Sequence, residues 1–251
     1  MLFDDGKLAS VIRRVDVRGM LVEITHAPPG GMKLGADKGI NLPDSELRLP
    51  SLTSADLENL DFAIAHADLI GQSFVRGPDD VRALQAEIAR RGARLGVLVK
   101  IETRAAFETL PRILLAAMAT PPVGVMVARG DLAVELGYER LAEVQEEILW
   151  LCEAAHLPVV WATQVLESLS KTGQASRAEV TDAAMGGRAE CVMLNKGPYV
   201  VNTVRFLSDV LHRMKLHQEK KRSMLRRLSI SSLTGRFLPA TRDSLSVEFS
   251  A

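Results

Sequence analysis

A lysine and a glutamate close one of the apolar runs of this sequence. Lys100 and Glu102 stand at the end of the run 95–101, with Ile101 between them. Because side chains alternate across a strand, we expect Lys100 and Glu102 on one side and Ile101 on the other. Ligand sites of parallel sheets lie at the carboxyl ends of the strands. There, Lys100 would provide a positive charge, and Glu102 would provide a carboxylate oxygen that can bind a metal. A purely structural ion pair at the end of the sheet is the alternative.

A second acidic residue follows the run 123–128, where the chain reads Arg129, Gly130 and Asp131. Gly130 permits a tight turn or a close approach to a ligand, and successive backbone N–H groups of such a turn can bind an anion. Glu102 and Asp131, on neighbouring strand ends, suit Mg²⁺, which one or two carboxylates hold together with substrate oxygens and water. A turn with a capping aspartate is the structural alternative.

A threonine, Thr163, ends the run 158–163. Its hydroxyl could donate or relay a proton to a substrate, and a helix N-cap is the structural alternative. Three successive strand ends therefore carry polar residues after apolar runs. Such a series is hard to explain by three separate structural roles, so we expect one site at a common edge of the sheet.

The elements that would position these residues alternate between apolar runs and helical patterns, which predicts an α/β fold. The predicted parallel strands are 69–75, 95–101, 123–128, 158–163 and 190–194, and the predicted helices are 54–66, 79–91, 104–118, 139–155, 177–186 and 200–214. Residues 1–36 are expected to form short β structure without helices. A length of 251 residues fits a complete eight-stranded barrel. Only five strand–helix units are found, so either further units come from elsewhere or the sheet is open.

Composition gives little support to several classes of function. The formal net charge is zero, which gives no support for a nucleic-acid or membrane partner. No apolar stretch approaches the roughly 20 residues of a membrane span, and the N-terminus does not have the pattern of a signal peptide. Cys152 and Cys191 are both expected to be buried, reduced thiols, which is typical of the cytoplasm.

Taken together, the strand-end motifs resemble those of pyruvate kinase. The motifs are Lys100-Ile101-Glu102, Ala128-Arg129-Gly130-Asp131-Leu132 and Ala162-Thr163-Gln164, with support from Lys38-Gly39-Ile40-Asn41-Leu42-Pro43, Leu49-Pro50-Ser51-Leu52-Thr53, Ser73-Phe74-Val75-Arg76, Ser176-Arg177-Ala178-Glu179 and Val192-Met193-Leu194. The resemblance implies a TIM (β/α)8 barrel with a small β lid domain inserted after its third strand. Residues 1–37 would be the end of that lid domain, residues 38–216 about strands 4–8 of the barrel, and residues 217–251 a basic, disordered tail.

The same resemblance implies the roles of the site residues. Lys100 would face the transferring phosphoryl group and the enolate oxygen, and Thr163 would lie where the enol carbon is protonated. Glu102 and Asp131 would hold Mg²⁺ or Mn²⁺. The substrate would be bound by side chains or backbone of Ser73, Lys100, Ala128, Arg129, Gly130, Asp131 and Thr163, with the backbone of 128–130 receiving its carboxylate.

The implied reaction is the glycolytic conversion of phosphoenolpyruvate and ADP to pyruvate and ATP, in a homo-oligomer that also uses K⁺. The family's K⁺ ligands and its first three barrel strands have no counterpart here, so the chain resembles a truncated, divergent member that is expected to be inactive or nearly so alone. It also has Asn195-Lys196-Gly197-Pro198 where the family has Ser-Gly-Glu, and it lacks the C-terminal regulatory domain. An Mg²⁺-dependent aldolase or lyase acting on a pyruvate enolate, and a non-catalytic remnant, are the alternative functions.

Overall fold

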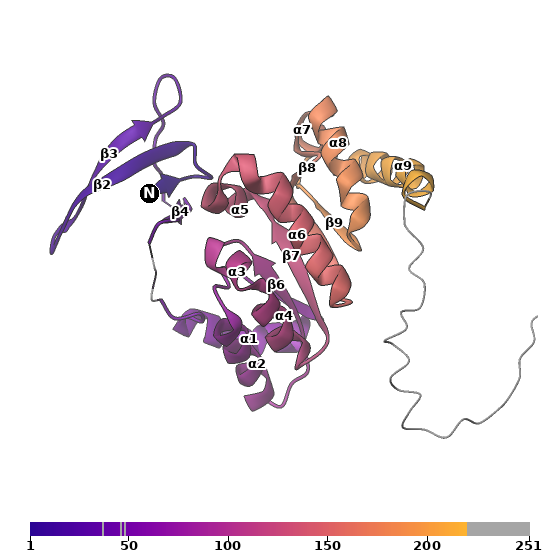
Figure 1. Ribbon diagram of the computed structural model, residues 1–251, viewed down its shortest axis with the longest axis horizontal. Coiled ribbons are helices and arrows are strands. Elements are labelled where there is room, and N and C mark those ends of the chain that lie inside the picture. Colours follow the sequence, from indigo (N-terminus) through magenta and orange to yellow (C-terminus); the bar gives the residue numbers. More distant parts are fainter. Residues whose placement is uncertain (37, 46, 48, 220–251) are drawn as a thin grey trace, which may run out of the picture. The chain divides into compact units, whose positions relative to one another are not determined.

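The computed structural model describes residues 1–219, apart from residues 37, 46 and 48 (Figure 1). Met1–Met214 form one compact unit. The last described helix, α9, comprises Val200–Glu219. The tail predicted for residues 217–251 therefore begins too early, because 217–219 belong to α9, and the rest of it lies outside the described residues. In the described part of the chain, no helix is both long and apolar enough to cross a membrane.

A parallel sheet forms the centre of the described chain. Its strands are β5 (Leu69–Gln72), β6 (Gly96–Ile101), β7 (Val123–Ala128), β8 (Val159–Val165) and β9 (Cys191–Leu194). The strands pair in chain order and every pair is parallel, as in a (β/α) barrel. The predicted fold class, α/β with a partial TIM (β/α)8 barrel of about strands 4–8 after a small β remnant, is confirmed.

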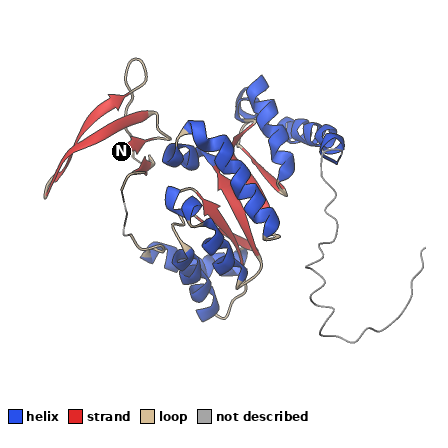
Figure 2. Cartoon of the chain, viewed as in Figure 1, coloured by secondary structure: helices blue, strands red, loops and turns tan. Residues whose placement is uncertain are grey.

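Helices alternate with these strands (Figure 2). Besides α9 they are α1 (Ser54–His66), α2 (Pro78–Arg90), α3 (Arg104–Glu108), α4 (Leu110–Met118), α5 (Arg129–Leu136), α6 (Leu141–Ala154), α7 (Glu167–Thr172) and α8 (Arg177–Met185), with short 3₁₀ turns at Tyr138–Arg140 and Gly186–Arg188. The bounds of α1 match the prediction because Thr53 and Asp56 form a capping box. The predicted single helix 104–118 was wrong, since Thr109 caps one helix and Pro111 opens the next.

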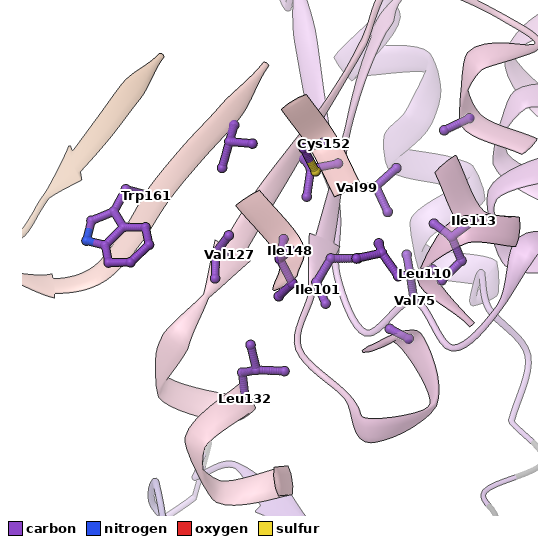
Figure 3. Packing of buried hydrophobic residues seen from close by; sticks show 14 of the residues in the cluster. Val75, Val99, Ile101, Leu110, Ile113, Val127, Leu132, Ile148, Cys152 and Trp161 are labelled. Atoms are coloured by element: carbon purple, nitrogen blue, oxygen red, sulfur yellow. The ribbon is translucent and has the colours of Figure 1, made fainter. Parts of the chain in front are cut away.

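The two faces of the parallel sheet differ in burial. Val99, Ile101 and Val127 point toward the helices and are fully buried, and Figure 3 shows them with Ile148 in the same apolar layer. The residues between them in sequence face the other way. On that face Leu69 of β5 is 62% exposed. The described residues therefore cover one face of the sheet and leave the other partly open.

The two cysteines differ in burial. Cys152, on α6, is buried in the apolar layer, and burial raises the pKa of its thiol to about 12. Cys191 is exposed, so the prediction that both thiols are buried was wrong for this residue. Its register partner on β8 is Val160, which lies on the open face.

The N-terminal residues form an antiparallel sheet. Its strands are β1 (Leu2–Phe3), β2 (Leu8–Asp16), β3 (Gly19–His26) and β4 (Ile40–Asn41), in the order β3-β2-β1-β4. The sheet is the small β element expected before the barrel strands. It extends past residue 37, because β4 pairs with β1. This pairing places Asn41 next to α5, where it contacts the site described below.

Candidate active site

Lys100 and Glu102 lie side by side at the carboxyl end of β6. Lys100 Nζ is 2.8 Å from Glu102 Oε1 and donates to Ser73 Oγ, also at 2.8 Å. Glu102 is 3% exposed and Lys100 is 25% exposed. Ile101, between them, points into the core. The structure therefore brings together Lys100, Glu102 and Ser73, and it includes the ion pair that the sequence left open as an alternative.

The second oxygen of Glu102 is held by the chain after β5. Oε2 accepts a hydrogen bond from the backbone N–H of Phe74 at 2.5 Å. Phe74 has a φ of 52°, an unusual conformation for a non-glycine residue. This conformation ends the strand at Gln72, so the predicted strand 69–75 was too long. Both Glu102 oxygens thus have donors, which explains how a carboxylate can be buried here.

Asp131 lies in the first turn of α5 and is half-buried. Its Oδ1 accepts from Asn41 Nδ2 at 3.4 Å, and the same amide nitrogen is 3.2 Å from Glu135 Oε1. Burial raises the pKa of Asp131, repulsion by Glu102 raises it further, and the Asn41 hydrogen bond opposes both effects. Asp131 therefore lies within electrostatic reach of Glu102.

Residues 128–131 form the start of a helix and not the predicted tight turn. Arg129, Gly130 and Asp131 are the first three residues of α5, and Ala128 provides no side-chain cap. The first N–H groups of a helix have no partner within the helix and favour a bound anion. If a substrate carboxylate binds here, the N–H groups of a helix start, and not those of a turn, would receive it.

Thr163 lies inside β8 and does not cap a helix. Its φ is 73° and that of Gln164 is 56°. A Cβ placed on Gly130 would stand 2.9 Å from the Thr163 Cγ2 methyl, so a side chain at 130 would collide with it. Glycine at this position is what allows α5 and the end of β8 to approach. Gly130 links Thr163 to the same site as Asp131.

The side chain of Arg129 was given no role from the sequence. It is buried and points toward β8, where it donates to the carbonyl oxygens of Ala162 and Thr163. Asn41 and Glu135 were missed as well. Asn41 belongs to one of the motifs that carry the resemblance, so the signal was present without an assigned role.

A pocket of about 270 Å³ adjoins this group of residues. It is lined by Asp5, Arg129, Gly130, Ala133, Tyr138, Leu141, Thr163, Gln164, Ala178, Glu179 and Asp182. Lys100, Glu102 and Asp131 do not line it. The pocket therefore lies on the α8 side of Thr163, beside the residues that carry the carboxylates.

The two carboxylates fit the metal that the motifs imply. Among the described residues, no three His, Cys, Asp or Glu side chains cluster as a complete protein-made metal site. Mg²⁺ does not require one, since it is held through one or two carboxylates with substrate oxygens and water. Burial first, and repulsion by Glu102 second, raise the pKa of Asp131, and a bound cation would offset that repulsion. Lys100 would compete with that cation for Glu102.

The segment Asn195–Pro198, which departs from the family motif, packs against α7. Asn195 Nδ2 donates to Glu167 Oε1 at 3.0 Å. A Cβ on Gly197 would stand 2.1 Å from the Ser170 carbonyl oxygen, so the two backbones are in close contact. The segment thus has a structural role at the end of β9. In the described part of the chain, no hydrogen bond or ion pair joins it to Lys100, Glu102, Asp131 or Thr163.

The fold and the strand-end residues together define part of an α/β barrel domain, and comparison with known proteins agrees. The family model "Pyruvate kinase, barrel domain" matches residues 1–204, so this chain belongs to the pyruvate kinase family. It is 36% identical over 208 residues to "Pyruvate kinase PKLR" of Rattus norvegicus, covering 80% of this chain and 35% of that protein. It is 34% identical over 218 residues to "Pyruvate kinase" of Mycobacterium tuberculosis, covering 84% and 44%.

The chain spans less than half the length of these relatives. "Pyruvate kinase 2" of Candida glabrata is similar to the same extent, 35% identical over 214 residues that cover 82% of this chain and 40% of that protein. The aldolase or lyase alternative and the non-catalytic alternative gain no support from these similarities.

Proposed function

We propose that this chain supplies the metal-binding and proton-handling side of a phosphoenolpyruvate site, for phosphoryl transfer to ADP with formation of pyruvate and ATP. One observation carries the proposal. At the carboxyl ends of three successive strands, Lys100 pairs with Glu102, Glu102 acts on the pKa of Asp131, and Gly130 beside Asp131 packs against Thr163. Membership of the pyruvate kinase family supports the reaction class.

Each of these groups has a task in that chemistry. The Lys100 ammonium would stabilise the negative charge that develops on the enolate oxygen. The free N–H groups at the start of α5 would bind the substrate carboxylate. The Thr163 hydroxyl would deliver the proton to the enolate carbon, because protonation of an enolate needs only a positioned donor.

Glu102 and Asp131 would hold the divalent cation. When bound, Mg²⁺ supplies positive charge that stabilises enolate and phosphoryl oxygens. The burial of Glu102 excludes water from one side of this position, which strengthens the electrostatic effect of every nearby charge.

The test uses the partial reaction in which these residues are proposed to act, the enolisation of pyruvate, and not the complete phosphoryl transfer, for which the chain alone is expected to be inactive or nearly so. Pyruvate is incubated with the full chain and Mg²⁺ in D₂O, and loss of the methyl proton signal is followed by NMR. We expect Mg²⁺-dependent exchange that falls at least tenfold in Glu102→Gln and in Lys100→Met. Glu108→Gln, an exposed carboxylate on α3, is the matched control and should exchange at the wild-type rate.

Binding of Mn²⁺, followed by EPR titration, provides a readout that does not require turnover. Binding should be lost in the double variant Glu102→Gln/Asp131→Asn and retained in Glu108→Gln. Exchange without added metal, or Mn²⁺ binding that is the same in the double variant, would refute the proposal. So would a folded wild-type chain that neither exchanges pyruvate protons nor binds Mn²⁺.

A further inference from the structure

We infer that the Arg129 side chain is a positioning residue, which clamps the end of β8 in the conformation that presents Thr163. The inference rests on the proposed function for the role of Thr163 in proton transfer. The clamp itself is a statement about the backbone, and it can be tested separately.

All three nitrogens of the Arg129 guanidinium have partners. Nε donates to the Ala162 carbonyl at 2.7 Å, and Nη2 donates to the Thr163 carbonyl at 2.5 Å. Nη1 pairs with the Asp182 carboxylate from α8. The side chain is only 10% exposed. A desolvated cation with this full set of partners is fixed in place, because losing any one of them would leave a buried polar group unsatisfied.

The backbone that Arg129 holds is strained. Thr163 and Gln164 both have positive φ, at 73° and 56°. Such conformations are rare for residues other than glycine, and for a β-branched residue such as threonine they are outliers. They persist only where the surroundings enforce them, and they concentrate at functional sites.

The pairing of β8 with β9 does not enforce this conformation. Its register shifts between Trp161 and Val165, so the ladder is irregular where the strain lies. Arg129 instead binds two consecutive carbonyl oxygens in this stretch with one planar group. A guanidinium can bridge them, whereas the ammonium of a lysine offers a single point charge without that geometry.

Two further contacts fix the clamp and its target. The guanidinium carbon of Arg129 lies 4.6 Å from the centroid of the Trp161 ring, a cation–π contact that restrains the guanidinium from the side. The Thr163 methyl lies against Gly130, the residue after the arginine. The segment Arg129–Gly130 therefore restrains both the backbone and the side-chain orientation of Thr163.

Amide hydrogen–deuterium exchange, read by mass spectrometry on peptides that contain residues 162–165, tests the clamp directly in the full chain. We expect these amides to exchange at least tenfold faster in Arg129→Lys, which keeps the charge and loses the bridge. Arg188→Lys is the matched control, because Arg188 pairs with Glu146 nearby without holding β8, and its exchange at 162–165 should equal that of wild type.

The second readout is the Mg²⁺-dependent exchange of pyruvate protons. In Arg129→Lys the maximal rate should fall at least tenfold, while the KM for pyruvate and the affinity for Mn²⁺ stay within threefold of wild type. A merely structural arginine would lower Mn²⁺ affinity and rate together. That result, or unchanged amide exchange at 162–165, would overturn the inference.

The two readouts separate this inference from the proposed function. If the wild-type chain does not exchange pyruvate protons but Arg129→Lys loosens residues 162–165, the clamp stands and the proposed function fails. If Arg129→Lys does not fold, Asp182→Ala replaces it, since it removes the partner of Nη1 and leaves the arginine in place. Amide exchange at 162–165 should then rise at least threefold, and no change would overturn the clamp.

Discussion

Replacement of Glu102 by glutamine should destabilise the metal-free chain. Glu102 Oε1 forms an ion pair with Lys100 Nζ at 2.8 Å, and Oε2 accepts from the Phe74 N–H at 2.5 Å, at a position that is 3% exposed. Glutamine has the same shape but only one acceptor oxygen. Its NH₂ group must therefore face either the ammonium or the backbone N–H, and one buried donor loses its partner.

The size of the effect follows from the exposure of the partners. Removing one member of a buried ion pair costs about 3–5 kcal/mol. Lys100 keeps 25% of its side chain exposed and can regain water, so we expect a smaller loss, about 2–3 kcal/mol. For a domain of this size each kcal/mol corresponds to about 2–4 °C, which gives a decrease in Tm of about 4–12 °C.

Urea unfolding followed by circular dichroism, in buffer with EDTA, measures the free energy of unfolding. Glu108→Gln provides the matched control and should unfold like the wild type. In the double variant Lys100→Met/Glu102→Gln the loss should be smaller than the sum of the two single losses, since the partners are removed together. If Glu102→Gln unfolds within about 0.5 kcal/mol of wild type, the hydrogen bonds assigned to this carboxylate do not hold the site together.

Three further predictions concern single residues. Because the pKa of Asp131 is raised above 3.8, its contribution to stability is present below pH 3.8 and is lost as the pH rises through the folded pKa. Asp131→Asn should therefore gain stability relative to wild type as the pH rises toward neutrality in metal-free urea titrations, and a difference that does not change with pH would contradict this. Iodoacetamide at pH 8 should modify Cys191 and spare Cys152, whose pKa is about 12, as judged by peptide mass spectrometry; equal labelling would refute the burial. Gly130→Ala should lose about 1–3 kcal/mol through its collision with the Thr163 methyl, and Thr163→Ser, which lacks that methyl, should restore most of the loss; no restoration would place the strain elsewhere.

The parts of the fold that local signals specify were predicted well. The strand 123–128 has the predicted bounds, because an apolar run lies between two prolines and a polar segment. The helix α1 has them as well, because its capping box is written in the sequence. The end of β5 could not be predicted, since it depends on the distant carboxylate that holds Phe74 in a left-handed conformation.

In the candidate site too, the features set by local sequence were predicted and those set by distant contacts were not. Strand alternation was enough to place Lys100 and Glu102 together. Helix α5 was missed because Gly130 is typical of a turn, whereas in the structure this glycine serves the close approach of Thr163. The Arg129 clamp could not be predicted from spacing, because its partners lie more than thirty residues away along the chain.

The amide of Asn41 has a consequence for how the two sheets communicate. This single donor belongs to β4 of the N-terminal sheet, and it lies 3.4 Å from Asp131 Oδ1 and 3.2 Å from Glu135 Oε1. A cation that draws on Asp131 therefore changes what holds β4 in place, and displacement of β4 changes the charge that the cation meets. Thermodynamic linkage makes the two effects equal in size. A contact that holds β4 in place therefore changes the affinity of Asp131 for a cation by the same factor as the cation changes the stability of that contact.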